Sequence, residues 1–179
     1  MQEEKGIIQS NEKIAKDTYR MKIAAGMAKD MKPGQFVNIK IDGYMLRRPI
    51  SISSIEADGF VIVYKVVGDG TLALAKKHAH HIIDVFGPLG SSYPIHENRN
   101  EVLLIGGGVG VPPLYELAKQ YRVLRKEVHV VLGFNDKDSV FYEQEFKALG
   151  CHVVVATMDG SYGVKGCLLY TSDAADDQA

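Results

Sequence analysis

Two short motifs hold the residues whose types and spacing best suit chemistry. The first spans residues 47–51, Arg-Arg-Pro-Ile-Ser, just ahead of an apolar strand. The second spans residues 106–113, Gly-Gly-Gly-Val-Gly-Val-Pro-Pro, directly after the apolar run 102–105. An arginine beside a proline on a strand is a rigid cation, which suits a planar, anionic cofactor such as a flavin dinucleotide. A glycine loop between a strand and a helix lets a second nucleotide approach the backbone closely.

The arginine motif predicts contacts with a pyrophosphate and a flat ring. Arg48 can bind a pyrophosphate through paired hydrogen bonds, and Pro49 fixes the chain so that Ser51 can hydrogen-bond near the ring. Further along, Thr71 is expected to cap a helix, where its hydroxyl and the first unpaired N–H groups form an anion site. Each motif alone is equally well explained without a ligand, as a surface arginine or as a simple helix cap. Both together, followed by a glycine loop, favour dinucleotide binding.

The glycine loop predicts a second nucleotide site. It lacks the spacing Gly-x-Gly-x-x-Gly, so a tight turn without a ligand is the alternative. A proline suits the first helical turn, where no N–H partner is needed. Nicotinamide-nucleotide contact is expected at Gly106, Gly107, Gly108, Gly110 and Pro112. Residues 159–161 follow a predicted strand at its carboxyl end, where they either contact this nucleotide or form a simple turn.

Composition indicates an ordinary globular protein. The chain has 179 residues, 46% of them hydrophobic, and a net charge of −1, which leaves room for one large or two small domains. The chain has no excess of basic residues, so its charge does not indicate nucleic-acid binding. The N-terminus lacks a signal-peptide pattern, and no apolar run approaches the roughly 18 residues of a membrane span. The two cysteines form no spaced framework, so a cytoplasmic location is expected.

The first half of the chain predicts an antiparallel barrel. Strands are expected at residues 6–16, 18–25, 35–41, 50–55, 60–67 and 82–86, and a helix at residues 71–78. Turn signals such as those at residues 32–34 and 57–59 separate the strands. Short strands at this spacing favour a closed barrel over a parallel sheet.

The rhythm changes after a polar stretch at residues 91–100. Strands are expected at residues 101–105, 127–134 and 152–157, with helices at residues 112–125 and 139–149 between them. This alternation favours a parallel α/β sheet. We therefore expect a flavin-binding barrel domain at residues 1–95 and a partial nicotinamide-nucleotide-binding α/β domain at residues 100–166, whose three-stranded sheet is incomplete.

Other candidate residues are interpreted as structural. His78, His80 and His81 are crowded, but they straddle a predicted helix end and face different ways, so no metal site is expected. Cys151 opens a strand and is expected to be a small, buried, apolar residue, and the strands at 127–134 and 152–157 are expected to be core. Tyr64 either stacks on the flavin or packs inside the barrel; the sequence leaves both open.

Four segments together resemble a known family. Residues 46–52, 63–71, 87–90 and 106–115 are similar to the electron transfer subunits of dihydroorotate dehydrogenase B, within the ferredoxin reductase-like flavoproteins. The Arg-Pro-x-Ser element alone indicates only the superfamily, whereas its combination with Gly-Gly-Gly-Val-Gly-Val-Pro-Pro-Leu-Tyr is more specific. The resemblance covers residues 1–166.

The resemblance implies a set of cofactors and a partner. Members of this family bind FAD and a [2Fe–2S] cluster, oxidise NADH, and pass electrons to an FMN-containing catalytic subunit in pyrimidine synthesis, as a heterotetramer. By the family pattern, the FAD is lined by Arg48, Pro49, Ile50, Ser51, Val63, Tyr64, Lys65, Gly70 and Thr71. A related flavin reductase, a ferredoxin–NADP reductase-type subunit and a non-catalytic flavin-binding fragment are the alternatives.

The chain departs from that family at its C-terminal end. The cluster needs four closely spaced thiolates, and the chain has only Cys151 and Cys167. Residues 167–177 resemble the translated read-through of a common sequencing adapter. We therefore expect a coding sequence that is cut short after residue 166 and an artefactual, disordered tail at residues 167–179.

Overall fold

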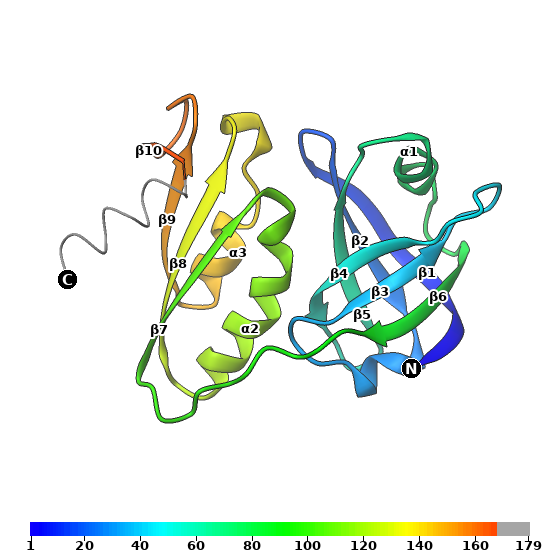
Figure 1. Cartoon of the computed structure of the whole chain (residues 1–179), viewed down its shortest axis with the longest axis horizontal. Helices are drawn as coiled ribbons and strands as arrows, with labels where there is room; N and C mark the ends of the chain where they lie inside the picture. Colours follow the sequence, from blue (N-terminus) through cyan, green and yellow to red (C-terminus); the bar gives the residue numbers. More distant parts are fainter. Residues whose placement is uncertain (168–179) are drawn as a thin grey trace.

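The computed structural model describes residues 1–167, which form a barrel and a separate layered sheet (Figure 1). Six strands close the barrel in the order β1-β2-β5-β4-β3-β6. Their bounds are β1 (Gln2–Ala15), β2 (Thr18–Ala24), β3 (Phe36–Lys40), β4 (Arg48–Ile55), β5 (Gly59–Lys65) and β6 (Ile82–Leu89). A 3-10 turn, η1 (Gly26–Asp30), lies between β2 and β3, and the short helix α1 (Asp69–Ala75) lies between β5 and β6.

The long first strand closes the barrel. β1 pairs antiparallel with β2, where Ile7 lies opposite Ala24, and also with β6, where Gln2 lies opposite Gly87. Alternation along each strand then sends every second side chain inward, so that Phe60 and Ile62 of β5 are fully buried in the barrel core. Closure leaves no strand edge unpaired, which removes the usual site of edge-to-edge association.

The second unit is a parallel sheet in the order β10-β9-β8-β7. Its elements are β7 (Glu101–Gly107), the 3-10 turn η2 (Gly108–Gly110), α2 (Pro112–Val123), β8 (Glu127–Phe134), η3 (Lys137–Ser139), α3 (Glu143–Ala148), β9 (His152–Thr157) and β10 (Val164–Lys165). Both helices lie on the face toward the barrel (Figure 1). Two successive right-handed crossovers that proceed in the same direction place their helices on the same face.

The two faces of this sheet therefore differ. On the helix-covered face, Val128, Val130 and Leu132 are at most 1% exposed. On the opposite face, Leu103 is 57% exposed and Val154 is 49% exposed. The expectation that both strands are core is correct for one face and wrong for the other.

The α/β unit docks on the outer side of β4. The carboxylate of Glu116, on α2, accepts a hydrogen bond of 2.8 Å from the Ile55 backbone N–H. Lys119 Nζ donates to the Ile55 carbonyl at 3.0 Å and lies 2.8 Å from a Glu116 oxygen. Ser53 and the Tyr142 hydroxyl share a buried hydrogen bond of 2.8 Å. Backbone groups of a barrel strand thus hold the two units together.

The predicted barrel and parallel sheet are confirmed, and three local predictions are wrong. α1 begins at Asp69 with Gly68 as its N-cap, so Thr71 occupies the third helical position and is not the N-cap. α3 begins at Glu143, because Tyr142 takes a left-handed conformation with φ of 68° that stops a helix from starting earlier. The short β10 was not predicted and adds a fourth strand to the sheet.

Two further predictions concern the chain end and membranes. The expected artefactual, disordered tail lies outside the described residues, apart from Cys167. Within residues 1–167, no helix has the length and apolar character needed to cross a membrane.

Candidate functional site

The first part of the site is formed by Arg48 and the start of α1. A Cβ placed on Gly70 would lie 2.6 Å from Nη2 and 2.8 Å from Nε of Arg48, so only glycine lets the guanidinium lie there. The group is also held by a hydrogen bond of 2.6 Å to the Leu46 carbonyl and lies 5.6 Å from the Tyr44 ring centroid. Among residues 1–167, Leu46 is its one hydrogen-bond acceptor, which leaves donors to face an anion.

The neighbouring Arg47 is a contrasting cation. It donates to Asp84 at 2.8 Å and to Glu3, and its hydrogen bond to Asp84 is the main cause of its raised pKa. Two carboxylates therefore already neutralise Arg47. Of the two adjacent arginines, Arg48 is the one with charge to offer a pyrophosphate.

The hydroxyl of Thr71 is bound within its own helix turn. It donates to the Gly68 carbonyl at 3.0 Å and accepts from the Val67 N–H at 2.9 Å. The expected hydroxyl contact with an anion stays a prediction, and in the structure this oxygen organises the turn. What Thr71 contributes is the shape of the segment that brings Gly70 against Arg48.

The predicted flavin-lining residues of β4 and β5 lie on two sides of the barrel wall. Pro49 is exposed and Ser51 is half-buried on the outer side, next to the Ser53 position that contacts the α/β unit. Ile50 points into the barrel core. Val63, on the outer side of β5, packs in the core of the α/β unit. Of these residues, Pro49 and Ser51 are the ones whose side chains lie where a cofactor could reach.

Tyr64 packs inside the barrel. Its ring stacks on Tyr19 with centroids 5.9 Å apart, and its hydroxyl donates to the Asn11 side chain at 2.9 Å. Burial raises the pKa of this phenol well above its usual value. Of the two roles left open by the sequence, the structure supports core packing, so any cofactor contact by Tyr64 would come from its backbone.

The second part of the site is a cavity of about 390 Å³ at the carboxyl ends of β7 and β8. Lys65 and Thr18 of the barrel face the glycine loop across it. Its lining residues are Thr18, Lys65, Gly107, Gly108, Val109, Gly133, Phe134, Asn135, Ser139, Phe141, Met158, Gly166 and Cys167. Both units thus contribute to one cavity at the sheet edge where open α/β sheets bind ligands.

The glycines of the loop have different tasks. A Cβ on Gly106 would lie 2.7 Å from Leu114, so this glycine permits the close packing of α2 on β7. Gly108 has φ of 52° and an open space where a side chain would stand, and it lines the cavity together with Gly107. Gly110 is exposed, and Pro112 is buried at the first position of α2. Gly107 and Gly108 are therefore the loop residues in position to meet a nucleotide.

Residues 159–161 form a turn. Asp159 accepts hydrogen bonds from the Ser161 N–H at 2.9 Å and the Ser161 hydroxyl at 2.7 Å, and these bonds lower the pKa of the Asp159 carboxyl. Gly160 between them has φ of 73°. These contacts account for all three residues without a nucleotide, so of the two open interpretations the structure supports the turn.

Comparison with known proteins identifies the family. No protein-family model matches the chain. The chain is 51% identical over 167 residues to the dihydroorotate dehydrogenase B electron transfer subunit of Fusobacterium nucleatum, covering 89% of this chain and 64% of that protein. It is 42% identical over 186 residues to the same subunit of Bacillus mycoides, covering 98% of this chain and 70% of that protein. The chain belongs to the family of dihydroorotate dehydrogenase B electron transfer subunits.

A solved structure agrees with this family assignment. The structure of an NADH-dependent reduced ferredoxin–NADP oxidoreductase, studied for flavin-based electron bifurcation, superimposes with a TM-score of 0.83 at 34% sequence identity. The superposition covers 97% of this chain and 64% of the chain in that structure. Like the curated subunits of the family, it is substantially longer than the chain described here.

One cofactor of dihydroorotate dehydrogenase B electron transfer subunits does not fit the residues present. A [2Fe–2S] cluster needs four ligands, usually thiolates, and the chain has two cysteines. Cys151 is buried in the α/β core, as expected, and burial raises the pKa of its thiol. Cys167 lies at the nucleotide cavity. These two positions provide no cluster site.

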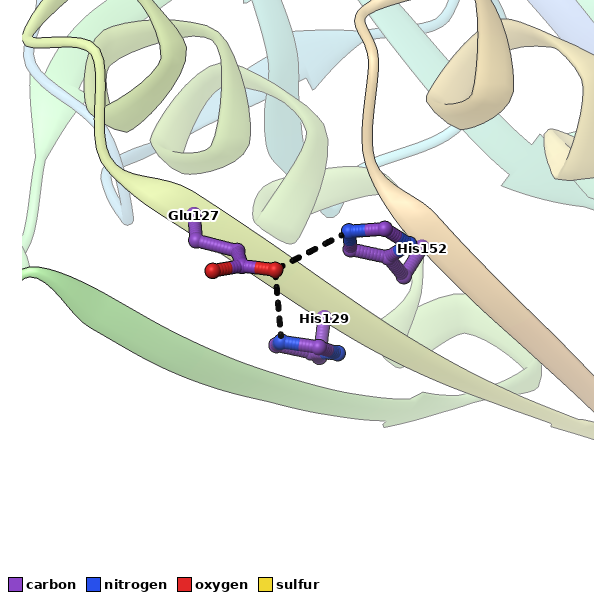
Figure 2. A group of neighbouring side chains, drawn as sticks. All are labelled: Glu127, His129 and His152. Carbon is purple, nitrogen blue, oxygen red and sulfur yellow. Dashed lines mark ion pairs between the residues drawn. The ribbon is translucent and has the colours of Figure 1, made fainter.

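Sequence reasoning missed two groups of residues in this family member. Glu116 lies within the predicted helix at residues 112–125 and was not singled out, yet the residue is only 4% exposed and its carboxylate binds the barrel backbone. Glu127, His129 and His152 were assigned to core strands, yet they meet on the open sheet face (Figure 2). Their separation along the chain hides the second group, because only strand register brings its members together.

Proposed function

We propose that this chain is the flavin- and nicotinamide-binding part of an electron transfer subunit. The subunit passes electrons between NAD(H) and the FMN-containing catalytic subunit of dihydroorotate dehydrogenase, in pyrimidine (UMP) biosynthesis. The observation that carries the proposal is the pair of sites joined by β4 and β5. Because β4 and β5 are antiparallel, Arg48 at the start of β4 and Lys65 at the end of β5 lie at the same end of the barrel. Arg48 lies against Gly70 there, and Lys65 lines the cavity of the glycine loop.

The barrel, residues 1–95, is the proposed FAD domain. Arg48 supplies donors to the pyrophosphate, with Gly70 and Thr71 forming the turn beside it. Pro49 and Ser51 present an outer strand face to the flavin ring. Ile50, Val63 and Tyr64 contribute through backbone groups, since their side chains are buried elsewhere.

The α/β unit, residues 100–166, is the proposed NAD(H) domain. Gly107 and Gly108 let the nucleotide approach the end of β7, while Gly106, Gly110 and Pro112 shape the turn into α2. The cavity between this loop and Lys65 is where the nicotinamide nucleotide would lie against the barrel. A lysine there suits a ligand that carries phosphate charge.

The chemistry needs a converter between two-electron and one-electron carriers. A bound flavin accepts a hydride as an electron pair and can return the electrons singly. The task of this chain is to hold both nucleotides at one interface and to exclude water between them. Glu116, Lys119 and the Ser53–Tyr142 hydrogen bond fix that interface, so they act as positioning residues.

The onward path lies beyond this chain. The names of the curated relatives support a partner catalytic subunit, and the proposed assembly is a cytoplasmic heterotetramer. The two cysteines here cannot hold the cluster that such a subunit uses. The second candidate function is a related flavin reductase that gives its electrons to free acceptors.

The first test measures FAD affinity in matched arginine variants. Arg48→Ala should weaken FAD binding at least tenfold, because it removes charge-assisted hydrogen bonds worth about 1.5–3 kcal/mol. Arg47→Ala is the control, since its cation is already neutralised by Asp84 and Glu3, and FAD affinity should change much less. Equal FAD affinity in the wild-type chain and the Arg48→Ala variant would refute the flavin site.

The second test separates the two nucleotides. Gly108→Val places a side chain at the cavity and at a backbone angle that β-branched residues avoid. FAD affinity should remain, while anaerobic reduction of the flavin by NADH should slow markedly. A dihydroorotate-oxidising partner then distinguishes the two candidate functions. Electron delivery that requires the partner supports the transfer subunit, and delivery to free acceptors alone supports the flavin reductase.

A further inference from the structure

Four polar side chains gather on the open face of the α/β sheet, at the amino ends of its strands. Strand register explains how they meet: Glu101 of β7 lies opposite Glu127 of β8, and His129 of β8 lies opposite His152 of β9. Glu127 and His129 are two residues apart on one strand, so both point to the same face. The result is a block of two carboxylates and two imidazoles on three adjacent strands. The nucleotide cavity lies at the opposite ends of these strands.

The ligand atoms of this block converge. The candidate donor atoms of Glu127, His129 and His152 all lie within 4.8 Å of one another. Nε2 of His152 lies 3.2 Å, and Nε2 of His129 lies 3.8 Å, from the same Glu127 oxygen. Figure 2 shows both rings turned toward that carboxylate. The rings stack nearly parallel, with centroids 4.8 Å apart and planes inclined by 21°.

One atom in the block is short of a partner. Nε2 of His129 is buried from solvent and makes no hydrogen bond within residues 1–167. A Glu101 oxygen lies 2.7 Å away and forms an ion pair with this nitrogen only if the imidazole is protonated. Buried polar atoms are nearly always paired, so this one points to a missing neighbour.

We propose that Glu127, His129 and His152, with Glu101 beside them, bind a divalent transition-metal ion such as Zn²⁺. Zinc binds imidazole nitrogen at about 2.0–2.1 Å and carboxylate oxygen at about 2.0–2.2 Å, so its ligand atoms are about 3.3 Å apart. The separations of 3.2 and 3.8 Å from Glu127 are close to this value. Because the two rings are stacked, at least one of them has to rotate for both Nε2 atoms to face the same ion. Two imidazoles select zinc, nickel or copper over magnesium and calcium.

The charge of the block agrees with a cation. Glu101 and Glu127 bring two negative charges to one exposed spot, and neutral imidazoles do not cancel them. A divalent ion would neutralise both carboxylates and satisfy His129 at once. Because its ligands come from β7, β8 and β9, the ion would fasten three adjacent strands of the sheet, which makes the site structural. The competing arrangement is a metal-free cluster in which both histidines are protonated and ion-paired.

The test uses the full chain, stripped of metal by a chelator and titrated with Co²⁺ and then Zn²⁺. Wild-type protein should bind one equivalent of Co²⁺ with visible d–d absorption and without thiolate-to-cobalt bands. Zn²⁺ should displace the cobalt and raise the melting temperature, because the ion binds only the folded sheet. His152→Ala is the decisive variant, since this side chain is 64% exposed and its loss leaves the fold intact.

Matched variants decide between the block and other histidines. His152→Ala should abolish the cobalt absorption and the zinc-dependent rise in melting temperature, and Glu127→Gln should weaken binding at least tenfold. The control is the His78→Ala/His81→Ala double variant, which removes the other neighbouring pair, with centroids 5.7 Å apart. Binding that survives His152→Ala, or that is lost in the control, would overturn the proposal. Absence of any saturable wild-type binding would leave the ion-paired cluster as the correct description.

Discussion

The barrel and the α/β unit bury their apolar side chains in different ways. The barrel closes on itself, so its six strands have no free edge and its core needs no neighbour. Within residues 1–167 the α/β sheet is open, with β7 and β10 at its edges and with helices on one face (Figure 1). It also draws Val63 of the barrel into its own core. The barrel therefore buries its core without the α/β unit and is the self-sufficient unit. The sheet completes its core with a barrel residue and is the dependent unit.

The largest expected effect comes from matched core truncations. Phe60 in the barrel and Phe146 on α3 are both fully buried. Phe60→Ala should destabilise the protein by about 3–5 kcal/mol, because the closed barrel cannot collapse around the cavity. Phe146→Ala should fall toward the lower end of that range, since the short helix can move inward. Denaturant unfolding of both variants measures the difference.

Hydrogen exchange sharpens the same comparison in the wild-type chain. Amides of β1, β2 and β5 should exchange more slowly than those of β7, β8 and β9, because the open sheet unfolds locally at lower free energy. Equal protection in the two units, or equal cost of the two phenylalanine truncations, would show that the sheet is as self-sufficient as the barrel.

An intermediate effect is expected at the contact between the units. Glu116→Ala leaves the partly buried Ile55 N–H unpaired and removes the carboxylate partner of Lys119, at a cost of about 1–3 kcal/mol. The two units should then melt in separate steps in calorimetry. Lys147→Ala is the control on α3; its exposed ion pair with Glu143 contributes only about 0.3–0.5 kcal/mol. A single unchanged transition in Glu116→Ala would contradict this account of the contact.

The smallest effect at neutral pH is expected for Tyr142→Phe. The substitution removes the hydrogen bond to Ser53, worth about 0.5–1.5 kcal/mol. Burial raises the pKa of Tyr142 from 10.0 to about 12. The unfolded chain therefore loses this proton first, and wild-type stability falls as the pH rises from about 10 to about 12. Urea unfolding across this range should show a shallower fall in the variant, and the other tyrosines with a raised pKa, Tyr64, Tyr115 and Tyr162, should provide the remaining slope. An unchanged slope would mean that Tyr142 is exposed in solution.

Local sequence signals predicted the main elements well. β-branched alternation marks β5 and β8, and glycine-proline turns mark where strands end, so fold class followed from neighbouring residues alone. The predicted bounds of β8 and β9 match the structure. Arg48, Gly107 and Gly108 lie where a ligand could reach them, because each sits at a strand end set by its own segment.

Features that depend on distant pairing escaped prediction. Nothing near Tyr64 shows that Asn11, far away in sequence, accepts its hydroxyl and holds the ring in the barrel. Thr71 was given the wrong place in its helix because Gly68 and Thr71 both suit a helix start. The pairing of His129 with His152 depends on a register that arises only when β8 and β9 align.

The contact of Glu116 and Lys119 with β4 has a consequence for how the two units can diverge. Both side chains bind the backbone N–H and C=O of Ile55, which nearly every amino acid at position 55 would supply. Position 55 can therefore be substituted without loss of these two hydrogen bonds, and proline is the exception because it has no N–H. A barrel from a distant relative, fused to this α/β unit, should still form the backbone hydrogen bonds with Glu116 and Lys119 at the position of Ile55. Recombination can thus exchange one unit for a related one while these backbone contacts between the units are retained.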